Sequence, residues 1–248
     1  MRSNTAAREI LVGSGTGGRI VPDRVVQTLR RWVWPCGPEA LNRLESWVED
    51  RYRSVQALVD APPDDPAWRQ WLGGILSTRP HRETLLSELP RDRTREILRS
   101  AQRGAFGPGD VESIASQIRG APREVCRDIA ADLLHCAAPD RLALLARWVC
   151  HPERGRGILT ELAEPPPRTY EEAQARLGEL RLQVARLGFP SRTFAAVDVV
   201  LALAYAGLLS DAAQETFHSG GLETLLPGNY GLATMVLGVR RRRSRADR

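Results

Sequence analysis

The sequence is organised around residues 194–209, which read Phe-Ala-Ala-Val-Asp-Val-Val-Leu-Ala-Leu-Ala-Tyr-Ala-Gly-Leu-Leu. A helix formed by this stretch is apolar on every side, so it must be buried on every side, in a protein core or in a membrane. A membrane span needs about 20 apolar residues. The run between Arg192 and Asp211 is shorter, and it contains Asp198, whose carboxylate would be costly near the centre of a bilayer. We therefore expect a buried core helix that ends near Gly207, followed by a short helix from Asp211 to His218.

Asp198 is the charged residue within this apolar helix. We predict that it forms a buried polar site with Tyr205. The two residues are seven positions apart and so share a helical face. A buried carboxylate beside a phenol can act as a catalytic acid–base pair with shifted pKa values. Buried charges are usually paired structurally, however. Since all 35 basic residues of the chain are arginines, we expect an arginine to neutralise Asp198.

Helical patterns also fill the chain before this stretch. A stripe spaced as on one face of a helix runs from Leu41 to Val59. Asp65 followed by Pro66 is typical of a helix start. Five of the six tryptophans lie between residues 32 and 71. We expect this aromatic stretch to form core, and its alternative role is a partner surface. The candidate residues for that surface are Trp32, Trp34, Trp68 and Trp71.

One pattern recurs at a spacing of 32 residues. Residues 90–97 and 122–129 share the template Pro-Arg-acid-x-x-Arg-acid-Ile. Each copy precedes a second helix start, at residues 108–110 and 138–140, and a degenerate third copy begins at residue 152. Helical hairpins of this length stack because one hairpin cannot bury its own apolar face. The alternative is an irregular bundle, because Pro-Arg-acid is also a general helix start.

The fold class that we predict is all-α, in two parts. A helical-hairpin stack, solenoid-like or an irregular bundle, comprises residues 22–164. A proline linker at residues 165–168 separates it from a smaller helical domain, residues 169–239, around the buried central helix. Thr169 and Glu172 form a capping box at the start of this domain. Residues 1–21 form a flexible, glycine-rich arm, because their G-x-G-x-x-G letters are not followed by strand–helix alternation.

The excess positive charge of the chain is confined to its last nine residues, 240–248. The net charge is +5, and the tail alone supplies it. Clustered arginines bind phosphate through charge and paired hydrogen bonds. We expect a polyanion-binding tail that recognises nucleic acid or an anionic membrane surface, with an unbound terminus as the alternative. Its binding residues are Arg240, Arg241, Arg242, Arg243, Arg245 and Arg248.

Motifs for catalysis, metal binding or cofactor binding are missing from the sequence. The pairs His135-Cys136 and Cys150-His151 lack the spacing of zinc ligands. Neither G-x-S-x-G, H-E-x-x-H nor a Walker A sequence occurs. We therefore expect no enzyme activity, no metal and no cofactor.

A function follows only as a class. Residues 1–9 lack the apolar run of a signal peptide, and four irregularly spaced cysteines do not predict a disulfide framework. We expect a cytoplasmic, non-enzymatic protein–protein interaction subunit or adaptor of a larger intracellular assembly. The alternatives are nucleic-acid binding and peripheral membrane attachment, both through the arginine tail.

Overall fold

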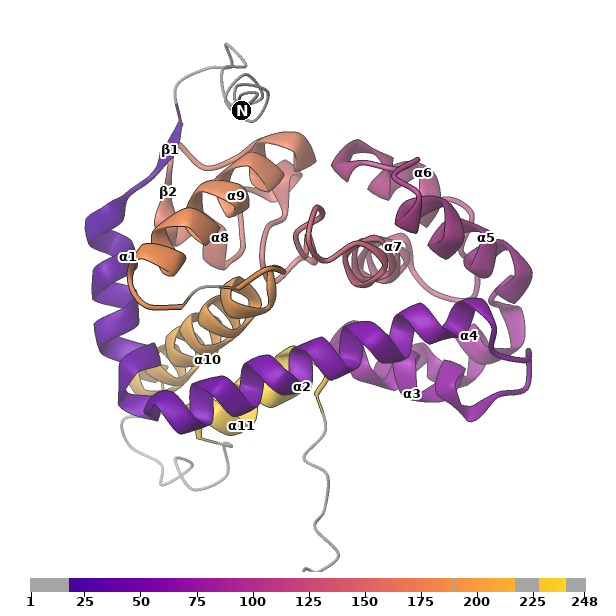
Figure 1. Cartoon of the computed structure of the whole chain (residues 1–248), viewed down its shortest axis with the longest axis horizontal. Coiled ribbons are helices and arrows are strands. Elements are labelled where there is room, and N and C mark those ends of the chain that lie inside the picture. The colour runs from indigo at the N-terminus through magenta and orange to yellow at the C-terminus, as the bar shows by residue number, and fades with distance from the viewer. Residues whose placement is uncertain (1–17, 190, 217–227, 240–248) are drawn as a thin grey trace, which may run out of the picture.

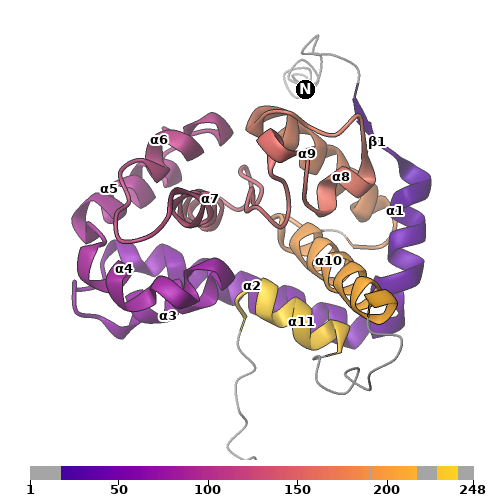
Figure 2. The same ribbon diagram turned by 180° about the vertical axis from the view of Figure 1, so that it is seen from behind.

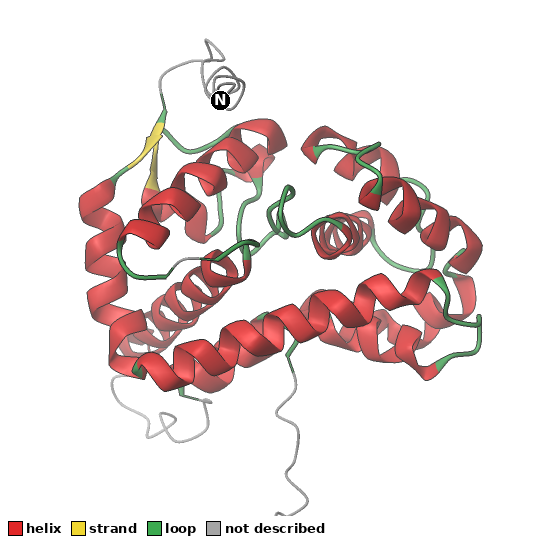
Figure 3. Cartoon of the chain, viewed as in Figure 1, coloured by secondary structure: helices red, strands yellow, loops and turns green. Residues whose placement is uncertain are grey.

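The computed structural model of the chain describes residues 18–189, 191–216 and 228–239. The predicted fold class is confirmed, because these residues form an all-α structure with one short pair of strands (Figure 3). The strands are β1 (Arg19–Ile20) and β2 (Ala163–Glu164). The α-helices are α1 (Pro22–Thr28), α2 (Pro38–Gln56), α3 (Pro66–Gly74), α4 (Arg82–Glu88), α5 (Arg91–Gln102), α6 (Val111–Ala115), α7 (Arg123–Ala137), α8 (Ile158–Leu162), α9 (Tyr170–Arg186), α10 (Ala195–Thr216) and α11 (Asn229–Val236). Short 3-10 or π turns are η2 (Leu29–Val33), η3 (Trp34–Cys36), η4 (Ala57–Val59), η5 (Leu76–His81), η6 (Pro108–Asp110) and η7 (Pro152–Arg154).

Helix α2 runs across the width of the molecule and joins its two sides. Helices α1, α8, α9 and α10 lie on one side, and α3 to α7 lie on the other (Figure 1). Helix α11 packs against α10 and is seen in front of α2 when the molecule is viewed from behind (Figure 2). Pro38 begins α2. Glu39 lies in the first turn of this helix, where its negative charge interacts favourably with the positive end of the helix dipole. Its buried stripe comprises Leu41, Leu44, Val48, Tyr52 and Val55.

Helix α10 contains the stretch that organises the sequence, and other helices surround it. It contacts α2, η2, α8, α9 and α11. The segment Ala195–Ala213 is long and apolar enough to cross a membrane, but 67% of its most apolar window is buried inside the protein. The burial of the stretch in the core agrees with the expectation from the sequence.

Helix α10 is longer than the sequence predicts. The pattern predicted an end near Gly207 and a new helix from residue 211 to residue 218. Instead, one helix continues to Thr216, and residues 217–227 lie outside the described part of the chain. Gly207 does not end the helix. It allows the Trp32 ring to approach closely, because a Cβ at this position would lie 2.2 Å from Cδ1 of Trp32. The final helix, α11, includes Gly231, although the short, mixed sequence of residues 231–239 is compatible with either a strand or a helix.

The repeated template coincides with two helices, but its second hairpin does not form. Helices α5 and α7 each begin directly after a proline, at residues 90 and 122. Helix α6 follows the first copy, whereas turns follow the second copy and the helix expected at residues 138–140 is absent. Side chains of α7 hold this loop instead. Asp128 accepts a hydrogen bond from the Arg147 backbone N–H at 3.0 Å, and His135 binds the Leu142 carbonyl.

Contacts cross both boundaries that the sequence suggested. The predicted arm, residues 1–21, ends in β1, which pairs antiparallel with β2, so Arg19 and Ile20 are held in a ladder. Residues 1–17 lie outside the described chain. Beyond the proline linker, α9 packs on β1 and α10 packs on α2. The division into domains at residues 165–168 stays a prediction.

Candidate functional site

Three polar side chains meet where α2, α7 and α10 pack together. We call Tyr52, His135 and Asp198 the buried polar cluster. Their exposed fractions are 3%, 0% and 3%. The Tyr52 hydroxyl donates to Asp198 Oδ2 at 2.5 Å, and His135 Nε2 lies 2.7 Å from the same oxygen. The cluster therefore connects α7, which precedes the proline linker, and α10, which follows it, to helix α2.

Both ring nitrogens of His135 face oxygen acceptors. Nδ1 lies 2.6 Å from the Leu142 carbonyl oxygen, and Nε2 faces the Asp198 carboxylate. Since a carbonyl and a carboxylate only accept hydrogen bonds, this geometry favours the imidazolium, which donates from both nitrogens. Burial opposes the charged form, but the charge and hydrogen bond of Asp198, together with the Leu142 carbonyl, raise the pKa of His135 overall. The geometry and the raised pKa thus favour a buried ion pair between His135 and Asp198.

A second buried pair lies beside this cluster. Arg51 Nη2 donates to Asp132 Oδ1 at 2.6 Å, and the Trp71 indole N–H donates to Asp132 Oδ2 at 2.8 Å. Arg51 Nη1 also lies 3.2 Å from the Cys136 sulfur. Burial lowers the pKa of Arg51, but the neighbouring Asp132 outweighs it and raises that pKa further. Both oxygens of Asp132 are therefore engaged in holding α2, α3 and α7 together.

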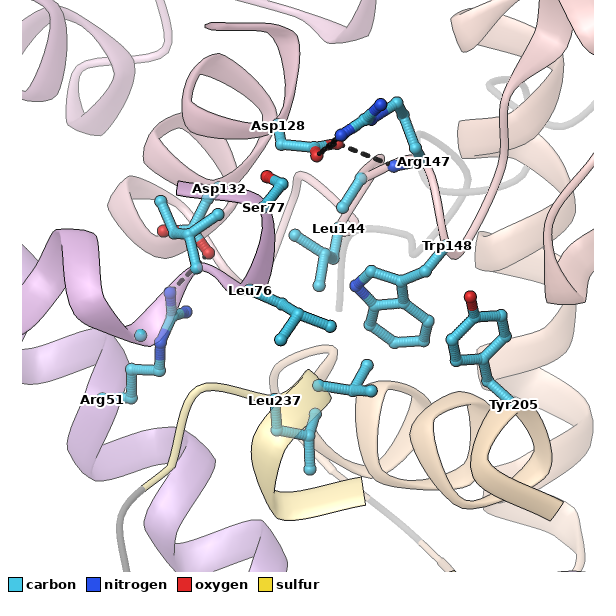
Figure 4. Close-up of a pocket in the computed structure, with 14 residues that line it drawn as sticks. Arg51, Leu76, Ser77, Asp128, Asp132, Leu144, Arg147, Trp148, Tyr205 and Leu237 are labelled. Atoms are coloured by element: carbon cyan, nitrogen blue, oxygen red, sulfur yellow. Dashed lines mark hydrogen bonds and ion pairs between the residues drawn. The ribbon is translucent and has the colours of Figure 1, made fainter. Parts of the chain in front are cut away.

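A cleft of about 290 Å³ opens next to this pair (Figure 4). The side chains around it come from α2, α7, α10, α11 and the segments after α3 and α7. Trp148 lies between Leu76 and Tyr205 in the close-up, with Arg51 and Asp132 at one edge and Asp128 and Arg147 at another. The cleft combines an apolar interior with a few polar groups at its edges, which is the usual composition of a ligand pocket.

The predicted partner of Asp198 is wrong in two respects. Asp198 is buried as expected, but Tyr52 and His135 bind it instead of an arginine. Tyr205 does not bind it; this ring packs against Trp148 with ring centroids 5.7 Å apart. A shared helical face did not bring Tyr205 to Asp198, because residues seven positions apart lie about 10 Å apart along the helix axis. It could not show that side chains from α2 and α7 reach the carboxylate first.

The four candidate tryptophans separate into core and surface. Trp68 and Trp71 are 1% and 4% exposed, so neither can form part of an open partner surface. Their indole nitrogens donate to Pro62 O and Asp132 Oδ2. Trp32 is half-buried against Gly207. Only Trp34 of these four is clearly exposed, at 40%.

The cysteines and histidines do not form a metal site among the described residues, where no group of three His, Cys, Asp or Glu side chains is placed to hold an ion. Burial raises the pKa of Cys150 to about 12, and burial followed by Asp132 raises the pKa of Cys136. These thiols stay protonated at neutral pH, unlike a nucleophilic cysteine. His151 is buried, and both of its ring nitrogens lack a hydrogen-bond partner within the described chain.

Sequence reasoning missed the roles of His135, Arg51, Asp132 and Trp148. One signal was available for two of them. Asp128, Asp132 and His135 are spaced i, i+4 and i+7, so they share one face of the helix. The residues between them are all apolar. Polar residues on such a face predict buried pairing, although the pattern does not identify the partners.

The six candidate arginines of the tail lie outside the described residues, so their binding role stays a prediction. Comparisons of the chain with protein-family models, with curated proteins and with solved structures found no match.

Proposed function

We propose that this protein is a non-enzymatic interaction subunit or adaptor that presents a helical surface to a protein partner in the cytoplasm. A general acid or base must come within hydrogen-bond distance of its substrate. The buried polar cluster is almost wholly enclosed, and its polar atoms bind one another. These side chains therefore serve helix packing, which leaves the surface of the protein to carry its function.

The observation that carries this proposal is the exposed indole of Trp34. It lies in η3, directly after η2, and η2 packs against α10. Two contacts fix this junction: Trp32 lies against Gly207, and Arg31 pairs with Asp211 at 2.8 Å. Leu209, 43% exposed, belongs to the same part of α10. Tryptophan is enriched among the residues that dominate the energy of protein interfaces.

Affinity purification from the native host with full-length bait tests the proposal. We expect a stoichiometric partner with the wild-type chain and its loss with Trp34→Ala. Leu182→Ala is the matched control, because Leu182 is 52% exposed but lies on α9. Recovery of the same partner with Trp34→Ala, or a chain that stays monomeric and enriches no protein, would contradict the proposal.

A second function, nucleic-acid binding, is favoured by the arginines that surround the last described residue before the tail. Val239, the residue before Arg240, lines a cavity of about 410 Å³ together with Arg79 and Arg82. Val239, the last described residue before the tail, therefore lies beside two further arginines. We expect a single-stranded DNA oligonucleotide to bind with an affinity that falls steeply with salt, and deletion of residues 240–248 to abolish binding. Salt-insensitive binding, or binding to anionic vesicles only, would exclude this function.

A further inference from the structure

We propose that the cleft between α2, α7, α10 and α11 binds a small, uncharged, planar molecule of the aromatic or heteroaromatic class. This site goes beyond the proposed interaction role, because that role depends on Trp34 at the η2–α10 junction. The cleft, in contrast, is built from segments far apart in the sequence that converge on Trp148 (Figure 4).

The shape of the cleft favours a flat ligand. Trp148 and Tyr205 form an aromatic wall, with their rings tilted by 43°. Leu76, Leu144 and Leu237 supply apolar surface opposite and beside it. Aromatic rings pack against one another in offset or edge-to-face geometry and contribute more than their buried area alone. The volume of about 290 Å³ is near the lower limit of the roughly 300–1,000 Å³ that ligand pockets span, so the ligand is small.

The charges around the cleft favour an uncharged ligand. Arg51 is paired with Asp132 at 2.6 Å, and Arg147 is paired with Asp128 at 2.9 Å. Each wall therefore neutralises its own charge and leaves no counter-charge for a ligand. A charged molecule would lose hydration on entering without gaining an ion pair, which is unfavourable.

One polar group in the cleft has no partner. The Ser77 hydroxyl oxygen is buried and makes no hydrogen bond to any described residue, yet Ser77 lines the cleft. A buried hydroxyl without a partner costs free energy. Rotation of the Ser77 side chain toward the cleft would let a ligand supply that partner. A carbonyl or amide on the planar ring would fit this group, since a hydroxyl can donate or accept.

Fluorine NMR with the probe 4-fluorobenzamide tests this site on the full chain. We expect its resonance to broaden on addition of protein, with at least a tenfold weaker effect for 4-fluorobenzoate and 4-fluorobenzylamine, which carry a charge. Ser77→Ala should weaken the binding of the amide about 2- to 10-fold, which is the usual effect of one hydrogen bond.

Leu76→Trp fills the mouth of the cleft and should abolish binding. Leu76 is 40% exposed, and the matched control is Leu209→Trp, because Leu209 is 43% exposed outside the cleft. Circular dichroism verifies that both variants fold. If Leu76→Trp does not fold, the loss of amide affinity in Ser77→Ala tests the site instead. Absence of amide binding at millimolar concentration, equal binding of the charged probes, or unchanged binding by a folded Leu76→Trp variant would overturn the proposal.

Discussion

At the scale of single residues, the buried polar cluster is where charge, burial and helix packing depend on one another. Asp198 shares one carboxylate oxygen between Tyr52 and His135. Burial and the nearby Asp198 carboxylate raise the pKa of Tyr52 well above its ordinary value, so its hydroxyl stays a donor. Removing one member leaves the others buried without a full set of partners.

Asp198→Asn should lower the free energy of unfolding by about 3–5 kcal/mol, because it leaves the His135 imidazolium without its counter-charge. Chemical denaturation followed by circular dichroism measures this change. The control is Asp211→Asn, which removes a surface pair with Arg31 and should cost only about 0–1 kcal/mol. Equal effects of the two substitutions would show that the cluster does not hold the core.

The contribution of His135 should depend on pH. A raised pKa in the folded state means that folding favours the protonated ring. This stabilisation is fully present below the unfolded-state pKa, about 6.5, and is lost as pH rises through the folded-state pKa. We expect the difference in unfolding free energy between the wild type and His135→Gln to be largest near pH 6 and to shrink in more alkaline buffer. A difference that grows with pH would indicate a neutral His135.

Residue-scale prediction succeeded for burial and failed for partners. The position of Asp198 within an apolar helix was enough to predict that it is buried. The expected arginine was wrong because partner choice depends on which helices cross α10, and Arg51 is instead engaged by Asp132. His135 shares one face of α7 with Asp128 and Asp132, but its sequence neighbour Cys136 suggests only a pair without the spacing of zinc ligands.

At the scale of elements, helix starts were predicted best. Asp65 accepts a hydrogen bond from the Ala67 N–H at 2.7 Å with Pro66 in the first position. Thr169 caps α9 through the Glu172 N–H, although the Glu172 carboxylate binds the Arg168 N–H rather than closing the predicted box. Helix ends were predicted less well, because Gly207 has a tertiary role. Local sequence cannot distinguish a glycine that ends a helix from one that admits a neighbouring ring.

Substitution of two helical glycines separates these roles. Gly207→Ala should destabilise the protein by about 1–3 kcal/mol, because overpacking displaces the Trp32 ring. Gly178→Ala in α9 meets no atom within 4 Å and should stabilise by about 0.5–1 kcal/mol through helix propensity. Thermal and urea denaturation measure both changes. A neutral Gly207→Ala would mean that Trp32 does not pack closely on α10.

At the scale of the whole molecule, helix α2 links two sides that the sequence suggested were consecutive parts. The all-α class could be predicted because helical periodicity is local. The course of α2 between α7 and α10 could not, since contacts between residues such as Tyr52 and Asp198, 146 positions apart, leave no local signal. The cleft was missed for the same reason, because its walls come from distant segments.

Hydrogen–deuterium exchange of the α10 backbone amides, residues 195–206, in detergent-free buffer tests the central claim most directly. If neighbouring helices of the same chain enclose α10, these amides should exchange as slowly as the most protected amides of α2. Rapid exchange, or protection that appears only when lipid vesicles are added, would contradict it.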